Sequence, residues 1–138
     1  LFRSVQLSEG GLANSVRSLC KKLEELSGIH IGCQIADDLP RWNETEEVNI
    51  YRIVQECLTN IIKHSGATEA VICMARQNDG LRISISDNGS GFDRQEIQPG
   101  FGLTTMKERA DMLNARLTVS SEKGKGTQIM LEVPYEKD

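Results

Sequence analysis

The chain has 138 residues, of which 38% are hydrophobic and 26% are charged. A chain of this length is expected to fold as one domain with a core of its own, and the composition excludes a disordered or membrane-embedded protein. The 20 acidic and 16 basic residues give a net charge of −4. We therefore expect no binding of nucleic acid, which requires a basic face, and any anionic ligand must be held by local geometry.

The cysteines Cys20, Cys33, Cys57 and Cys73 lie far apart and form no C-x-x-C pair. This spacing favours neither a zinc site nor a redox motif, and a reducing compartment fits best, although four cysteines are enough to form bridges. No segment has the roughly 18 apolar residues of a membrane span, and no signal peptide opens the chain. We expect a cytoplasmic domain without direct membrane contact. Because the chain begins with Leu1, we interpret it as a piece of a longer protein, which could itself be membrane-anchored.

The first expected element is an amphipathic helix over residues 8–26, where apolar residues recur at spacings of three and four before Gly28. This helix could be the end of a linker from a missing domain, or it could dock onto the rest of the chain. Residues 29–36 alternate apolar side chains with polar or small ones, which predicts a half-buried strand. Residues 37–42, which include Pro40, are expected to form a loop.

The longest helix is predicted over residues 44–63. Asn43 precedes it as a capping residue, and Glu46 follows three positions later, which is a partial capping box. The remaining elements are strands at 70–76 and 81–86 joined by a turn at 78–80, a glycine-rich loop at 88–102, a helix at 103–113 capped by Asn114, and strands at 117–120 and 128–133 joined by a turn at 123–126. This order predicts a two-layer α/β (α+β) sandwich over residues 1–138, with a mixed, largely antiparallel sheet and helices on one face.

A polar stripe follows one face of the long predicted helix. Glu56, Asn60, Lys63 and His64 stand at positions i, i+4, i+7 and i+8, whereas the opposite face is apolar. Such stripes are usually solvated. Here, however, a carboxylate, an amide oxygen and a cation fall within about two turns, and these are the groups that serve as a base, a ligand of a hard cation and a phosphate contact.

Three glycine pairs follow, at positions 89–91, 100–102 and 124–126. Each pair alone is typical of a turn, and none belongs to a Walker A loop or a dinucleotide fingerprint. The first pair follows Asp87 at the end of a strand, where a buried carboxylate needs donors such as the exocyclic amine of a base. The second opens a helix whose free N–H groups favour phosphate. The third leads to the hydroxyl of Thr127.

In this order, four segments resemble the sequence boxes of the GHKL superfamily, which includes histidine kinases, type II topoisomerases, MutL mismatch-repair proteins and certain heat-shock chaperones. Residues 51–64 look like the N box of sensor histidine kinases of the nitrate-sensor-like subfamily. Residues 87–92, 100–110 and 124–127 resemble the three glycine boxes, and the resemblance covers about residues 7–134. It implies the Bergerat ATP-binding fold.

The resemblance also implies a site for ATP and Mg²⁺ along the polar stripe. Glu56 would be the catalytic carboxylate that takes a proton from the attacking group. Asn60 would bind Mg²⁺ through its side-chain oxygen, and Lys63 and His64 would contact phosphate.

For the adenine end, the resemblance implies that Asp87 accepts a hydrogen bond from the amino group of the base. Gly89 and Gly91 would turn the backbone under the base, and Thr127 would assist there. A lid over the triphosphate would be hinged at Gly100 and Gly102, and Leu103 would adjoin the nucleotide. On the helix that follows, Lys107 and Arg109 could reach phosphate or simply be solvated.

The implied activity is transfer of the γ-phosphoryl group of ATP to a histidine on a separate dimerisation domain of the same kinase, with a response regulator downstream. Neither His30 nor His64 lies in a sequence that resembles the acceptor helix, so we expect no autophosphorylation by this chain alone. We expect the isolated chain to be monomeric and the parent kinase to be a homodimer. The alternatives are an ATP-driven conformational switch, a serine kinase of the anti-sigma type, and an interaction module that retains the fold without catalysis.

Overall fold

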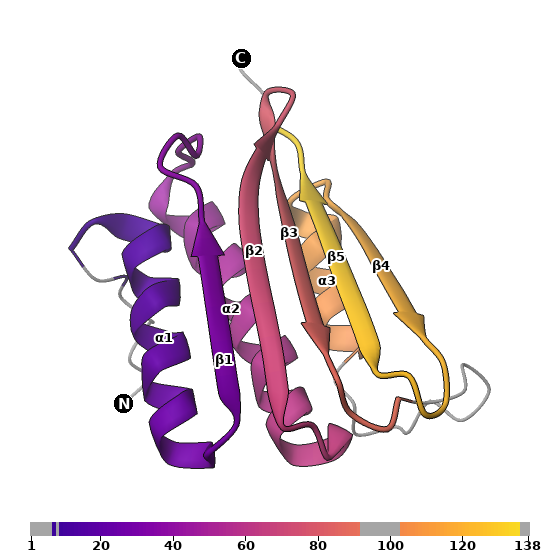
Figure 1. The fold of residues 1–138 in the computed structure, drawn as a ribbon. Helices are drawn as coiled ribbons and strands as arrows, with labels where there is room; N and C mark the ends of the chain where they lie inside the picture. The colour runs from indigo at the N-terminus through magenta and orange to yellow at the C-terminus, as the bar shows by residue number, and fades with distance from the viewer. Residues whose placement is uncertain (1–6, 8, 92–102, 136–138) are drawn as a thin grey trace, which may run out of the picture.

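The computed structural model describes residue 7, residues 9–91 and residues 103–135. Its elements are α1 (Gly11–Ser27), β1 (His30–Ile35), α2 (Glu44–Asn60), the π-helical turn η1 (Ile61–Ser65), β2 (Glu69–Gln77), β3 (Gly80–Asp87), α3 (Leu103–Met112), β4 (Arg116–Ser121) and β5 (Thr127–Val133). The strands form one sheet in the order β1-β2-β3-β5-β4 (Figure 1). The pair β1–β2 is parallel and the other pairs are antiparallel, which confirms the predicted mixed sheet. No helix in these ranges is long and apolar enough to cross a membrane.

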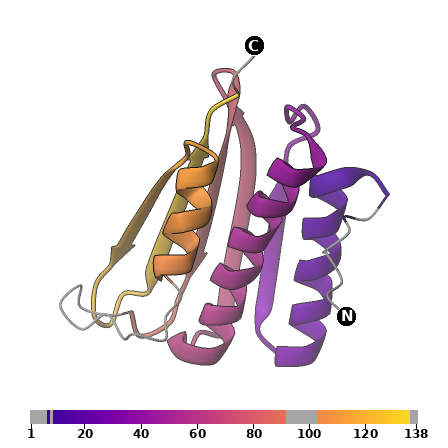
Figure 2. The same ribbon diagram turned by 180° about the vertical axis from the view of Figure 1, so that it is seen from behind.

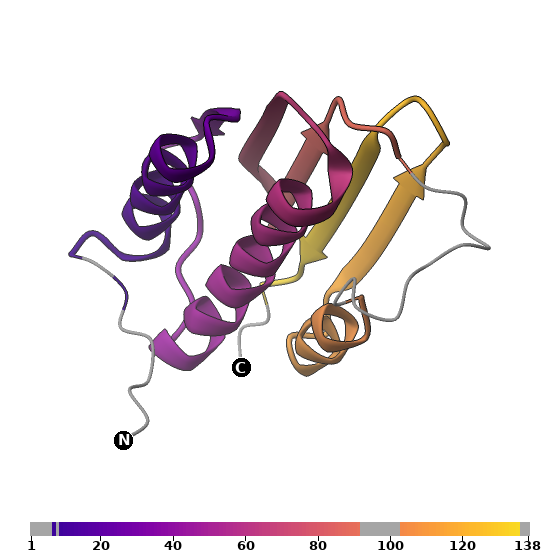
Figure 3. The same cartoon turned by 90° about the horizontal axis from the view of Figure 1, so that it is seen from below.

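The three α-helices cover one face of the sheet, as predicted. Figure 2 shows them in front of the strands, and Figure 3 shows the helical layer beside the sheet. Alternation along each strand directs every second side chain toward the helices. In β3, Leu81, Ile83 and Ile85 are buried in this way, whereas Arg82 lies on the open face and is exposed. The core therefore lies between the two layers, and Asp87 continues the helix-facing series of β3.

Helix α1 docks onto this layer. It buries Leu12, Val16, Leu19 and Cys20 in the core, which is the pattern that the spacing of its apolar residues predicts. It ends where Gly28 takes a left-handed conformation, with φ of 78°, and donates its N–H to the Glu24 carbonyl. The structure thus confirms that Gly28 stops this helix.

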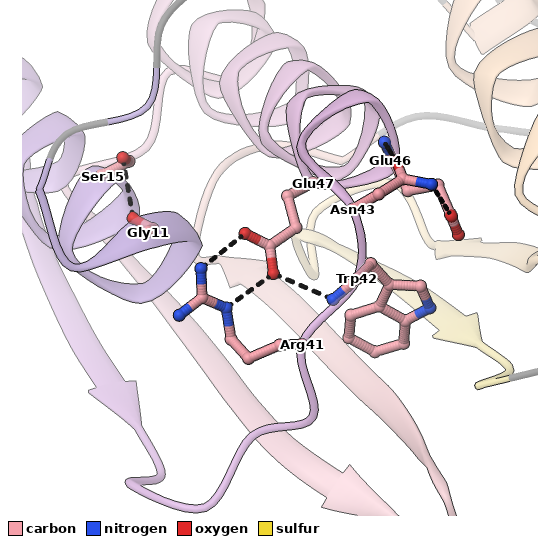
Figure 4. Close-up of polar contacts among 7 residues, drawn as sticks. All are labelled: Gly11, Ser15, Arg41, Trp42, Asn43, Glu46 and Glu47. Carbon is pink, nitrogen blue, oxygen red and sulfur yellow. Dashed lines mark hydrogen bonds and ion pairs between the residues drawn. The ribbon is translucent and has the colours of Figure 1, made fainter. Parts of the chain in front are cut away.

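The N-terminus of α2 is capped as the sequence predicts. The Asn43 side-chain oxygen accepts a hydrogen bond from the Glu46 backbone N–H at 2.8 Å. The Glu46 carboxylate in turn accepts one from the Asn43 side-chain amide (Figure 4). This reciprocal pair is a variant of the capping box, because the glutamate bonds the cap's side chain rather than its backbone.

Glu47, one residue further along α2, is buried beneath Arg41. Its carboxylate accepts hydrogen bonds from Arg41 Nε at 2.9 Å, from Arg41 Nη2 at 3.3 Å and from the Trp42 backbone N–H at 3.1 Å (Figure 4). These bonds to Glu47 raise the pKa of Arg41. At Gly11, a Cβ atom would come within 2.6 Å of Arg41 Nη2, so the guanidinium also packs against the start of α1.

The end of α2 differs from the prediction of one helix through Lys63. The α-helix ends at Asn60, and the chain continues as the π turn η1 before Gly66 takes a left-handed conformation. Two contacts explain the wider turn. Ser65 Oγ donates to the Ile61 carbonyl at 2.6 Å, and the Ser65 carbonyl accepts the Ser90 N–H at 2.8 Å. Such bonds compete with the α-helical ladder.

Candidate functional site

A cleft of about 430 Å³ lies between α2 and the start of α3. It is lined by Arg52, Gln55, Glu56, Thr59, Asn60, Lys63, Thr105 and Arg109. Of the predicted stripe, Glu56, Asn60 and Lys63 come together here, one turn apart along α2 and into η1. His64, which stands inside the π turn, is not one of the lining residues.

Packing in the core fixes how α3 meets this cleft. Met106 of α3 is fully buried, and Cys57 Sγ of α2 lies 3.2 Å from its sulfur. Thr105 and Arg109 stand one turn apart on the neighbouring face of α3, so both reach the cleft. Arg109 Nη1 also donates to the side-chain oxygen of Asn49 on α2 at 3.3 Å.

The electrostatics of the cleft are opposite to those of the whole chain. Its described lining residues include the three cations Arg52, Lys63 and Arg109 and the single carboxylate of Glu56, whereas the chain carries a net charge of −4. Burial raises the pKa of Glu56, and the charge of Arg109 partly offsets this by lowering it. The cleft therefore combines a locally positive surface with a carboxylate that is more basic than an exposed one.

Asp87 and Thr127 form a second polar group, at the end of the central strand β3 and the start of its neighbour β5. They are register partners in the β3–β5 pair and both continue the helix-facing series of their strands. Asp87 Oδ1 accepts the Gly89 N–H at 2.7 Å. Burial raises the pKa of Asp87, and the backbone N–H groups of Gly89 and Thr127 partly offset the rise. The Thr127 hydroxyl lies 2.9 Å from that of Ser121.

Close backbone contacts explain the first glycine pair. A Cβ at Gly89 would lie 2.4 Å from the Ser65 carbonyl oxygen. Gly91 has φ of 66°, and a Cβ there would lie 2.2 Å from the Glu122 carbonyl oxygen. Only glycine fits both positions. These contacts bring the end of η1 and the turn before β5 against the segment that follows Asp87.

Two predicted site residues, Gly100 and Gly102, lie outside the described residues, as does the predicted lid. Leu103 is the first residue of α3 and is partly buried against the core. Sequence reasoning missed Arg52 and Thr105. Arg52 precedes Glu56 by four positions, so the periodicity of the stripe could have revealed it, whereas Thr105 enters the cleft only through the packing of α3 on α2.

A family profile and several curated relatives match this chain. The family profile described as histidine kinase-, DNA gyrase B- and HSP90-like ATPase matches residues 45–137. The signal transduction histidine-protein kinase/phosphatase DegS of Brevibacillus brevis is 34% identical over 134 residues, which is 96% of this chain and 35% of DegS. The histidine-protein kinase/phosphatase UhpB of Salmonella typhimurium is 36% identical over 137 residues, covering 97% of this chain and 27% of UhpB. The chain thus spans between 27% and 35% of the length of these relatives.

Solved structures show the same fold. The blue-light activated histidine kinase EL346 of Erythrobacter litoralis aligns over 90% of this chain and 42% of its own, with a TM-score of 0.77 and 19% identity. Full-length ShkA in complex with AMPPNP aligns over 96% of this chain and 32% of its own, with a TM-score of 0.73 and 20% identity. The family profile covers well over half of the chain and includes both polar groups of the site. The chain is therefore a GHKL catalytic domain and belongs to the histidine kinase-, DNA gyrase B- and HSP90-like ATPase family.

Proposed function

We propose that this chain binds ATP with Mg²⁺ and supplies the γ-phosphoryl group to a histidine on a separate dimerisation and phosphoacceptor domain of the same kinase. The observation that carries the proposal is the cleft between α2 and α3, where Glu56, Asn60 and Lys63 converge. The charge of Lys63 beside Asn60 suits a phosphate group, in a chain whose net charge is −4. The relatives named as histidine-protein kinases support histidine as the acceptor.

The residues of the cleft fit a magnesium–phosphate group. Mg²⁺ takes few ligands from a protein and completes its coordination with water and substrate phosphates. Within the described ranges no three His, Cys, Asp or Glu side chains gather as a metal cluster, and the buried Asn60 offers an amide oxygen beside Lys63. When bound, Mg²⁺ would neutralise charge on the phosphate oxygens. Lys63 would contact the same phosphates from η1.

Glu56 would act as the base. As the acceptor nitrogen forms its bond to the γ-phosphorus, the bond from that phosphorus to the β–γ bridging oxygen breaks, and ADP leaves with the electron pair. The proton of the attacking imidazole passes to the Glu56 carboxylate. A carboxylate whose pKa is raised by burial is better suited to this than an exposed one.

Asp87 would select adenine. A carboxylate has about four lone-pair positions, and the N–H groups of Gly89 and Thr127 occupy part of this capacity. The remainder is available to the exocyclic amino group of the base. The presence of AMPPNP in the ShkA structure, which shares this fold, supports a nucleotide as the ligand.

Binding of a fluorescent ATP analogue with and without Mg²⁺ tests the nucleotide site. We expect Asn60→Ala to lose the Mg²⁺-dependent part of the affinity, at least about tenfold. Asn14→Ala, on the exposed face of α1, is the matched control and should bind like the unaltered chain. Equal, Mg²⁺-independent affinity of Asn60→Ala and the unaltered chain would contradict the proposal and favour an interaction module.

The acceptor is tested separately with labelled ATP. The chain alone should gain no acid-labile phosphate, whereas addition of the acceptor domain should produce an acid-labile, phosphohistidine-type product on that domain. An acid-stable product on an added protein would instead indicate a serine kinase. Incorporation of acid-labile phosphate into the chain itself would contradict the assignment of the acceptor to a separate domain.

A further inference from the structure

Two arginines of the cleft, Arg52 and Arg109, form no ion pair within 4.0 Å with a carboxylate in the described part of the chain. Arg52 Nη1 donates to the side-chain oxygen of Gln55 at 3.2 Å, and Arg109 Nη1 donates to that of Asn49 at 3.3 Å. Both partners are neutral amides. The guanidinium groups are therefore oriented by neutral partners. The charge of Arg109 acts on the Glu56 carboxylate, but no ion pair within 4.0 Å joins the two side chains.

These arginines lie at one end of the cleft. Arg52, Glu56 and Asn60 follow each other at intervals of four residues along α2, which is about 6 Å per interval. Arg52 is thus about 12 Å from Asn60 along the helix axis, on the far side of Glu56. The bond to Asn49 places the Arg109 guanidinium at the same end.

The proposed nucleotide lies toward the other end. Gly89, two residues after Asp87, packs against the Ser65 carbonyl at the end of η1, so the base-binding group adjoins the C-terminal end of the helix. Phosphoryl transfer places the attacking and leaving atoms roughly in line on opposite sides of the phosphorus. With the leaving ADP on the Asp87 side, the attacking histidine must approach Glu56 from the Arg52 side.

We propose that Arg52 and Arg109 form the docking point for an acidic side chain on the helix that carries the acceptor histidine. This inference rests on the proposed function, and it assigns the two arginines to the protein substrate rather than to ATP. The backbone of Arg52 lies about 12 Å from that of Asn60 along the helix axis, which exceeds the screening distance of about 8 Å at physiological salt, so a phosphate held at Asn60 is poorly placed to neutralise Arg52. A carboxylate of the arriving partner can neutralise Arg52 through the paired N–H groups that a guanidinium presents.

The test measures transfer from labelled ATP to the dimerisation and phosphoacceptor domain of the same kinase, supplied as a separate chain. We expect the double variant Arg52→Gln/Arg109→Gln to raise the KM for this acceptor about tenfold or more, while the Kd of MgATP stays within about twofold. Arg82→Gln, exposed on the open face of the sheet, is the matched control and should change neither. Raising the salt concentration should increase the acceptor KM of the unaltered chain and have little effect on the double variant.

An unchanged acceptor KM in the folded double variant would overturn the inference. A parallel rise in the Kd of MgATP would also overturn it, because the arginines would then belong to the nucleotide site. The double variant Arg52→Lys/Arg109→Lys keeps both charges and should recover part of the acceptor affinity. If circular dichroism shows that the glutamine variant is unfolded, the acceptor KM of the lysine variant is compared with that of the unaltered chain instead. Failure of the unaltered chain to bind MgATP would overturn the proposed function itself, and this inference with it.

Discussion

Replacing Arg41 with alanine tests how the start of α2 is held to the rest of the domain. The Glu47 side chain is only 2% exposed, and Arg41 supplies two of the three hydrogen bonds that its carboxylate accepts. In Arg41→Ala the carboxylate keeps the Trp42 N–H but loses its counter-charge, and it remains largely shielded from water. A buried charge without its partner is costly.

The size of the expected loss in stability follows from the unequal exposure of Arg41 and Glu47. Removing one member of a fully buried ion pair costs about 3–5 kcal/mol. The Arg41 side chain is 67% exposed, so water partly replaces it, and we expect a loss of about 2–3 kcal/mol, in the range of lost hydrogen bonds to a charged group. With an unfolding entropy of about 2.1 cal/mol/K per residue, this lowers the Tm by roughly 7–10 °C for a domain of this size.

Urea unfolding, followed by circular dichroism and by the fluorescence of the single tryptophan, Trp42, measures this loss. Arg76→Ala is the matched control. Arg76 Nε lies 3.7 Å from Asp38 Oδ2 and donates to the Asp38 carbonyl at 2.9 Å, and both side chains are well exposed, so its removal should cost about 1 kcal/mol. If Arg41→Ala costs no more than Arg76→Ala, the account of Glu47 as a buried carboxylate held by Arg41 is wrong.

Three further predictions concern backbone strain, pH and thiol chemistry. Gly91→Ala should destabilise the domain by more than about 2 kcal/mol, because its Cβ would lie 2.2 Å from the Glu122 carbonyl oxygen. Gly124 is also at positive φ but has open space around it, so Gly124→Ala should cost only about 1 kcal/mol. Similar losses for the two variants in urea unfolding would refute this. Because Arg109 lowers the pKa of Glu56, Arg109→Gln should move the acid limb of the kcat–pH profile to higher pH at saturating acceptor, and a shift to lower pH would contradict the base role. Cys57, whose pKa burial raises to about 12, should react with a thiol reagent at pH 8 only after unfolding, and labelling in the native state would show that it is accessible.

The order and type of the elements could be predicted because apolar periodicity reports directly on burial. The ends of elements depend on partners that periodicity does not reveal. The sequence predicts a turn at 78–80, yet Gln77 pairs with Gly80, and Asn78 takes the left-handed conformation. Gly80 belongs to β3, and a side chain there would lie 2.2 Å from the Val133 carbonyl oxygen. The rules for turns place Gly80 in the turn. Glycine is required at this position, however, because Val133 at the end of β5, far away in the sequence, approaches it closely.

The two walls of the site also differ in how far they could be predicted from the sequence. Glu56, Asn60 and Lys63 could be placed together from sequence, because one helix carries them at regular spacing. The opposite wall could not be, because Thr105 and Arg109 reach the cleft only after Met106 has packed against Cys57. Whether a cation on a helix is solvated or faces a ligand is decided by that packing and not by its own sequence neighbourhood.

The π turn connects the two polar groups of the site. Lys63 stands within η1 and lines the cleft, and Ser65 ends the same turn against the segment that follows Asp87. A regular α-helix through this stretch would advance each residue by about 100°, and a π turn advances each by less, because its hydrogen bonds span one residue more. The Ser65 carbonyl can therefore meet the Ser90 N–H at 2.8 Å while Lys63 still lines the cleft. The spacing between the proposed base contact at Asp87 and the proposed phosphate contact at Lys63 is thus set by one backbone segment, which any nucleotide bound across both groups would have to match.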